Sequence, residues 1–131
     1  MTTPTLHAAL RACAHGLYPA EASVDLLINH GTFLLRRDFR DRFIHLGTSI
    51  TDGTTAMAEI DWITAITALD IHDLPCSGGE QRILRLAASL AAGIPVDLRE
   101  ALTGLDDRNT ELTVTAVLHA TGRRPQLPKT P

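Results

Sequence analysis

The spacing of apolar residues along the chain is typical of amphipathic helices rather than of strands. In the N-terminal part it predicts one helix that begins at residues 3–4 and is closed by Gly16, and a second that begins at Pro19 and ends near His30. Gly31 follows directly and supplies the left-handed residue with which helices commonly end. We therefore expect the first 31 residues to form a helical hairpin.

Two further helices are predicted in the middle of the chain. Segments 33–46 and 56–69 both carry apolar side chains at helical spacing, the first with a candidate break near Leu35, and the loop-forming residues 47–55, rich in Gly and Thr, separate them. The inward positions of these helices are expected to be Phe39, Phe43, Leu46, Met57, Ile60, Ile63 and Ile66, with Trp62 as a further candidate. The β-branched residues of 56–69 lower helix propensity, so we expect tertiary packing to stabilise that helix.

The C-terminal half predicts three more helices. One covers residues 77–93, a short one begins at Asp97, and the last follows Asp106, although residues 111–118 taken alone also suit a strand. The sequence therefore predicts an all-α fold, a compact bundle of six or seven helices in one domain over residues 1–122. Residues 123–131 contain three prolines and no apolar period, and we expect them to form a flexible tail.

Composition narrows the range of partners. The chain has 131 residues, of which 44% are hydrophobic, and this is enough for one domain with its own core. The net charge of -3 provides no general attraction for nucleic acid. The N-terminus lacks a signal-peptide pattern, and no apolar run approaches the roughly 18 residues of a membrane span, so we expect a cytoplasmic protein without membrane contact.

One segment resembles a known nucleotide-binding motif. Residues 77–82, SGGEQR, and the helix after them resemble the signature loop of ABC-type ATPases, and residues 99–106 resemble the segment with that family's second acidic motif. The resemblance implies an ATP site completed across a dimer. That site also needs a Gly-rich loop ending in Gly-Lys-Ser/Thr, which this sequence does not contain. The family's magnesium-binding Asp is replaced by Arg99, so Glu100 is the one match to a catalytic residue.

The same residues have a purely structural interpretation. Ser77 and Glu80 have the spacing of a capping box, in which each side chain accepts a hydrogen bond from the other residue's backbone amide. The amides of Gly78 and Gly79 would then lie at a helix N-terminus, which favours anions. Ser77, Gly78 and Gly79 are therefore candidate anion-binding residues, and helix capping is the favoured interpretation.

A basic run suggests a second candidate site. Arg36, Arg37, Arg40 and Arg42 follow a predicted helix and turn, so residues 19–46 could form a helix-turn-helix-like element that contacts DNA. Asp38 and Asp41 lie among these arginines and neutralise half of their charge. The alternative interpretation is a solvated helix face.

Other reactive side chains form no recognisable constellation. His72 and Cys76, with Asp73 and Glu80 nearby, could supply metal ligands, but their spacing resembles no closed zinc pattern. We therefore predict no metal site, no cofactor and no catalytic residues.

Over most of its length the chain is similar to short actinobacterial proteins that share the segments LPCSGGEQR, IPVDLREALTGLD and VTAVLHA, a group for which no activity is known. The resemblance implies a bacterial cytoplasmic origin. The sequence favours a small interaction or accessory protein without catalysis of its own, bound to another protein or to a second copy of itself. A DNA-binding regulator and an anion-binding or nucleotide-binding subunit remain the alternatives.

Overall fold

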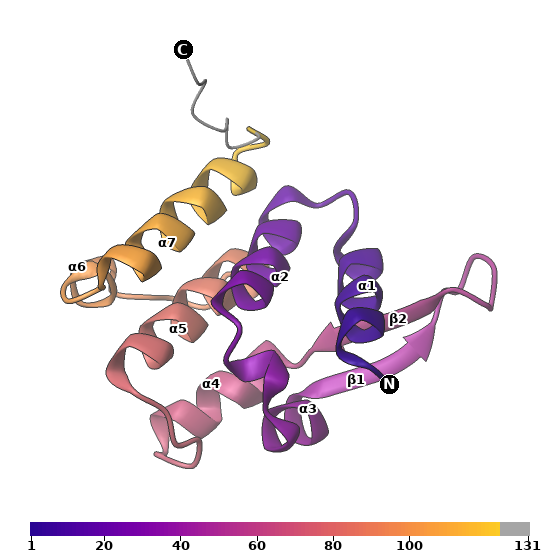
Figure 1. The fold of residues 1–131 in the computed structure, drawn as a ribbon, viewed down its shortest axis with the longest axis horizontal. Coiled ribbons are helices and arrows are strands. Elements are labelled where there is room, and N and C mark those ends of the chain that lie inside the picture. Colours follow the sequence, from indigo (N-terminus) through magenta and orange to yellow (C-terminus); the bar gives the residue numbers. More distant parts are fainter. Residues whose placement is uncertain (124–131) are drawn as a thin grey trace.

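The computed structural model describes residues 1–123 and shows a mainly helical fold with one small β-hairpin (Figure 1). The helices are α1 (Thr3–Ala14), α2 (Tyr18–His30), the 3-10 helix η1 (Phe33–Leu35), α3 (Arg37–Phe43), α4 (Trp62–Asp70), α5 (Gly78–Ala92), α6 (Leu98–Leu102) and α7 (Asp107–Ala120). The strands are β1 (Ile44–Thr48) and β2 (Ala56–Ile60). The prediction of a mainly α fold is confirmed, whereas the prediction that it is all-α is wrong.

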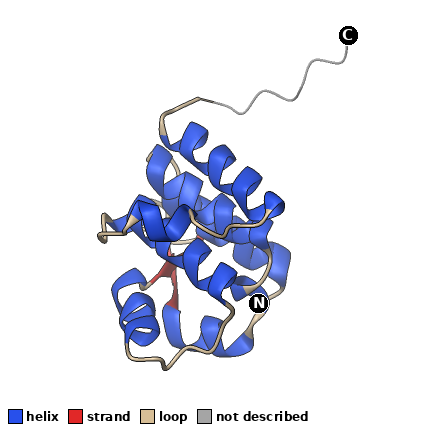
Figure 2. Cartoon of the chain, turned by 90° about the vertical axis from the view of Figure 1, so that its left-hand side faces the viewer, coloured by secondary structure: helices blue, strands red, loops and turns tan. Residues whose placement is uncertain are grey.

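Helix α2 occupies the centre of the fold. It packs against α1, α5 and α7, and its residues Ala22 and Leu27 are completely buried. The helix ends as predicted, because Gly31 adopts a left-handed φ of 82° and its N–H donates to the carbonyl of Leu27. Figure 2, viewed from the side of α6 and α7, shows the two strands behind the helices.

The three phenylalanines form one aromatic cluster below α2. Phe33 of η1 lies 5.2 Å from Phe39 between ring centroids, and Phe39 lies 5.1 Å from Phe43. All three rings are fully buried. The prediction that Phe39 and Phe43 point inward is therefore confirmed, and the cluster fixes α3 against the rest of the core.

The predicted helix over 33–46 is confirmed in part, as η1 and α3 with a break after Leu35, but it is wrong for residues 44–46, and the first part of the predicted helix over 56–69 is wrong. Helix α3 ends at Phe43, Ile44 is extended, and β1 pairs antiparallel with β2 from Ile44 opposite Ile60 to Thr48 opposite Ala56. In β2, Ala58 and Ile60 are buried while Glu59 is exposed, which is the alternation of a strand. Short apolar segments with β-branched residues fit both periods, and the pairing of the two strands decided between them.

Helix α4 begins only at Trp62. The Asp61 side chain accepts a hydrogen bond from the N–H of Thr64 at 3.1 Å and so caps the helix. Its buried face contains Ala65, Ile66, Ala68 and Leu69. Ile63, predicted to point inward, is 70% exposed because it lies on the side of α4 opposite these buried residues.

The C-terminal helices match the predicted segments. Helix α5 covers the predicted helix at 77–93, and α6 begins after its cap Asp97. Residues 111–118 are helical, which settles the alternative between helix and strand. Asp106 caps α7, and Arg108 donates to the carbonyl of Asn29 at 2.7 Å, so contacts with α2 stabilise a segment rich in β-branched residues. From residue 124 onward, the predicted tail lies outside the described residues.

Candidate functional site

Two of the four arginines proposed for DNA binding hold the fold together. Arg36 binds the carboxylate of Asp38 through Nε at 2.9 Å and Nη2 at 2.6 Å, and its Nη1 donates to the carbonyl of Pro75 at 2.6 Å. Arg42 donates to the carbonyl and the carboxylate of Asp73 at 2.9 and 2.8 Å. These contacts fasten α3 to the connection between α4 and α5, and the guanidinium of Arg36 lowers the pKa of Asp38.

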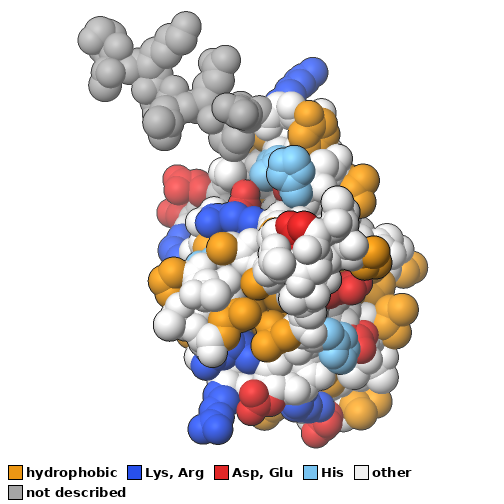
Figure 3. Space-filling view, turned by 90° about the vertical axis from the view of Figure 1, so that its right-hand side faces the viewer, with side chains coloured by type: hydrophobic (Ala, Val, Ile, Leu, Met, Phe, Trp, Pro, Cys, Tyr) orange, Lys and Arg blue, Asp and Glu red, His pale blue; other side chains and the backbone are white. Residues whose placement is uncertain are grey.

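The other two arginines lie on the surface. Arg37 forms an ion pair with Asp41 at 3.7 Å, and Arg40 has no ion-pair partner among residues 1–123. Figure 3 shows basic and acidic side chains intermingled on the lower part of the face that carries the hairpin. Three of the four arginines thus face an aspartate, which reduces the positive potential that a phosphate backbone requires.

Ser77 and Glu80 form the predicted capping box. The N–H of Ser77 donates to Oε1 of Glu80 at 2.7 Å, and the N–H of Glu80 donates to Oγ of Ser77 at 3.2 Å. The first of these bonds is the main cause of the lowered pKa of Glu80. The helix-capping interpretation of the SGGEQ segment is therefore confirmed at the level of hydrogen bonding.

The two glycines of this segment have the ends of polar side chains as neighbours. A Cβ on Gly78 would lie 3.3 Å from Nη1 of Arg82, and one on Gly79 would lie 3.4 Å from Nδ2 of Asn109. Arg82 in turn donates through Nε to the carbonyl of Glu100 at 3.2 Å. Residues 77–82 and 99–106, the segments for which the sequence suggested a resemblance to ABC-type ATPases, thus lie together, and Glu100 contributes a backbone carbonyl to that contact.

The potential metal ligands do not converge. In the described part of the chain, no group of three or more His, Cys, Asp or Glu side chains is placed to hold a metal ion. Asp73 is engaged by Arg42, and Glu80 by Ser77.

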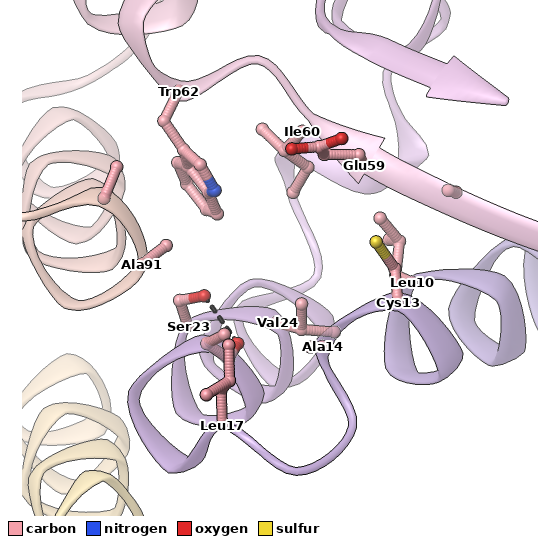
Figure 4. A pocket seen from close by; sticks show the side chains of 13 residues that line it. Leu10, Cys13, Ala14, Leu17, Ser23, Val24, Glu59, Ile60, Trp62 and Ala91 are labelled. Carbon is pink, nitrogen blue, oxygen red and sulfur yellow. Dashed lines mark hydrogen bonds between the residues drawn. The ribbon is translucent and has the colours of Figure 1, made fainter. Parts of the chain in front are cut away.

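An apolar pocket lies between the α1–α2 hairpin and the place where β2 passes into α4 (Figure 4). Its volume is about 280 Å³. It is lined by Leu10, Cys13, Ala14, Leu17, Ala20, Ser23, Val24, Ala58, Glu59, Ile60, Trp62, Ala91 and Ala92. Figure 4 shows Trp62, Ile60 and Glu59 on one side of the space and the residues of α1 and α2 on the other.

Local features of the sequence place these side chains. Gly16 adopts a φ of 93°, which lets the chain turn between α1 and α2 and leaves Leu17 at the rim. The Asp61 cap makes Trp62 the first residue of α4, so its indole extends toward Ala91 of α5. Pocket residues thus come from five elements, α1, α2, β2, α4 and α5.

Few polar groups line the pocket. The hydroxyl of Ser23 donates to the carbonyl of Ala20 at 2.7 Å and is satisfied. The indole N–H of Trp62 donates no hydrogen bond within residues 1–123, and Figure 4 shows its nitrogen toward the open space. Glu59 is the one charged residue of the lining. Partial burial, with a smaller contribution from Glu59, raises the pKa of the Cys13 thiol.

The pocket is suited to binding rather than to nucleophilic chemistry. A raised pKa keeps Cys13 in its thiol form at neutral pH, whereas a cysteine nucleophile reacts as the thiolate. No histidine lines the pocket to act as its base. The sequence did not indicate this site, because its residues lie far apart in the chain. The spacing of apolar residues marks Trp62 only as a candidate for the core.

Comparisons of the chain with protein-family models, curated proteins and solved structures find no match. The resemblances to ABC-type ATPases and to short actinobacterial proteins therefore stay predictions. None of the helices within residues 1–123 has the length and apolar character needed to cross a bilayer.

Proposed function

We propose that this protein is a non-catalytic interaction protein and that the pocket between Cys13 and Trp62 receives an apolar side chain of a partner protein. The observation that carries the proposal is the pocket itself, an apolar hollow on the surface of a small domain. Exposed apolar surface is costly in water, and pockets of this kind commonly receive the anchor residues of partners.

The size of the pocket is sufficient for one large apolar side chain. Pockets for drug-sized ligands and cofactors typically measure about 300–1,000 Å³. This pocket, at about 280 Å³, lies at the lower edge of that range. A single large apolar side chain from a partner requires less space than a cofactor does.

The rim of the pocket also favours a protein partner. Leu17 is 67% exposed although its side chain lines the pocket. A partner that inserts a side chain would also cover Leu17, and the burial of both groups would contribute to affinity. A ligand confined to the pocket would leave much of the Leu17 side chain in water.

Affinity purification with matched variants tests the proposal. Tagged wild-type protein, Leu17→Asp and Leu35→Asp are used as baits in a lysate of the native host, and the captured proteins are quantified by mass spectrometry. Leu35 is the control, because it is 60% exposed and does not line the pocket. We expect a stoichiometric partner that Leu17→Asp loses and Leu35→Asp retains.

The Leu17 variant is expected to stay folded. Leu17 is the N-cap of α2 and makes no side-chain capping bond. An aspartate there supplies an acceptor for the first turn, so its melting temperature should equal or exceed that of the wild type. Retention of the partner by Leu17→Asp would contradict the proposal. Capture of nucleic acid in place of a protein would instead favour the DNA-binding alternative, and capture of the untagged protein itself would identify a second copy as the partner.

A further inference from the structure

We infer that the apolar anchor of the partner is flanked by a lysine or arginine whose positive charge is recognised by Glu59. This inference rests on the proposed function, since it specifies the chemistry of the segment that enters the same pocket. It follows from the charge of the lining, the lack of an ion-pair partner for Glu59 within residues 1–123 and the place of Glu59 in the hairpin.

Glu59 is an unneutralised carboxylate beside an apolar hollow. It forms no ion pair and accepts no side-chain hydrogen bond within residues 1–123, whereas Asp38, Asp70 and Asp73 are each paired with an arginine. No arginine or lysine lines the pocket. The free protein thus presents one negative charge there and no counter-charge.

The neighbouring histidine, His45, does not take the place of an arginine or lysine as a partner for Glu59. His45 lies opposite Glu59 in the register of the two strands. Its Nε2, however, lies 3.4 Å from Oδ2 of Asp61, at the cap of α4. The hairpin therefore leaves the Glu59 carboxylate available at the pocket rim.

The charge of Glu59 acts on the interior of the pocket. Its carboxylate and the Cys13 thiol of α1 line the same hollow, and the carboxylate makes the smaller of the two contributions that raise the pKa of that thiol, after burial. An anionic group that entered would be repelled, and a cationic group would be attracted. Lysine and arginine suit this environment, because their methylene stems pack on apolar surface while the charged end stays near the rim.

The indole of Trp62 offers a hydrogen-bond donor that a peptide backbone can use. Its N–H faces the open space and donates no hydrogen bond within residues 1–123, so it is free to donate to a backbone carbonyl of the partner in place of water. A short peptide segment with basic and apolar residues supplies all three groups. These are a cation for Glu59, an apolar side chain for the hollow and a backbone carbonyl for Trp62. Charge complementarity therefore favours a protein segment with a net positive charge.

Three probes of equal chain length separate this inference from the proposed function. n-Hexylamine, 1-hexanol and hexanoate are titrated into the protein, and binding is followed by the fluorescence of Trp62, the single tryptophan of the chain. The variants are Glu59→Gln, Glu59→Lys and, as a control for the same charge change on exposed surface of α7, Glu111→Lys.

We expect hexylamine to bind the wild type about two- to fivefold more tightly than hexanol, as for a partly exposed ion pair, and hexanoate to bind most weakly. Glu59→Gln should bring the ratio of amine to alcohol close to one, and Glu59→Lys should make hexanoate the tightest probe. Glu111→Lys should keep the wild-type order.

The outcomes distinguish the two claims. If hexanol binds as tightly as hexylamine, or if the preference for the amine persists in Glu59→Gln, the inference about charge is overturned while the pocket still accepts an apolar group. If none of the three probes changes the fluorescence of Trp62, the pocket does not accept apolar groups, and the proposed function is overturned with the inference.

Discussion

The imidazole Nε2 of His119 lies 2.9 Å from Oε1 of Glu21 and so joins the last turn of α7 to the first turn of α2. Nδ1 of the same ring lies 3.5 Å from Oδ2 of Asp25. The buried residues of α7 are Asn109, Thr113 and Ala116, which offer little apolar area. These polar contacts with α2 add to the packing of the partly buried Leu112 and Ala120 against the core.

Replacement of Glu21 tests this attachment through its dependence on pH. The hydrogen bond with His119 and a second from the N–H of Gly16 hold the pKa of Glu21 below its ordinary value of 4.5. The stabilisation is therefore complete above that value and declines as the pH falls through the lowered pKa. We expect Glu21→Gln to lose about 0.5–1 kcal/mol at pH 7 and little at pH 3, measured by urea unfolding. An equal loss at both pH values would contradict this account.

The buried His30 should cause a second, separate dependence of the free energy of unfolding on pH. Its side chain is buried, its Nδ1 has no hydrogen-bond partner among the described residues, and burial lowers its pKa below the ordinary 6.5. The folded state thus disfavours the protonated ring, so stability declines as the pH falls from 6.5 to the lowered value. His30→Phe should flatten the stability curve between pH 7 and pH 5. A curve that keeps the wild-type slope would show that His30 does not titrate as the structure indicates.

The phenylalanine cluster should be the most sensitive part of the core. Phe39 contacts both Phe33 and Phe43 and is completely buried. Phe39→Ala is expected to cost about 3–5 kcal/mol, because it removes apolar contacts and leaves a cavity. Leu46→Ala, at a side chain that is 61% exposed, should change stability by less than about 0.5 kcal/mol. The free energy of unfolding in denaturant checks both values.

The SGGEQ segment allows a direct test of capping against anion binding. Ser77→Ala should cost about 1 kcal/mol, because the N–H of Glu80 loses its acceptor. Glu80→Gln should cost less, because glutamine also serves in a capping box. Phosphate should leave the melting temperature of the wild type unchanged. A rise with phosphate that is absent with chloride at equal ionic strength would favour the anion-binding alternative.

The sequence predicted correctly those helices whose ends are marked by capping residues or glycine. Gly31 and Gly93 end α2 and α5 in the left-handed conformation, and Ser77 with Glu80 begins α5. The hairpin was missed because residues 44–46 and 56–60 fit a helical as well as an alternating pattern and residues 47–48 belong to a segment with loop composition, so only the mutual pairing selects the strands. Tertiary contacts decide such segments.

The candidate sites also differ in how far along the chain their interacting residues lie, and this decides whether the sequence could predict them. The partners of Ser77 are within three residues, so the capping box could be predicted. Arg36 and Arg42 instead bind Pro75 and Asp73, which lie more than thirty residues further along the chain. The sequence therefore predicted a basic helix face, where the structure shows contacts that hold the fold. The pocket at Trp62 depends on five elements and has no local pattern of its own.

The most direct test of the pocket is the indole N–H resonance of Trp62 in a ¹H–¹⁵N correlation spectrum of the protein titrated with 1-hexanol. The chain has one tryptophan, so this signal is unambiguous. We predict a saturable shift of the indole signal together with the amides of Cys13, Ser23 and Ile60, which line the same space. An indole signal that stays in place while hexanol shifts amides elsewhere, or shifts none, would contradict the claim that this pocket receives apolar groups.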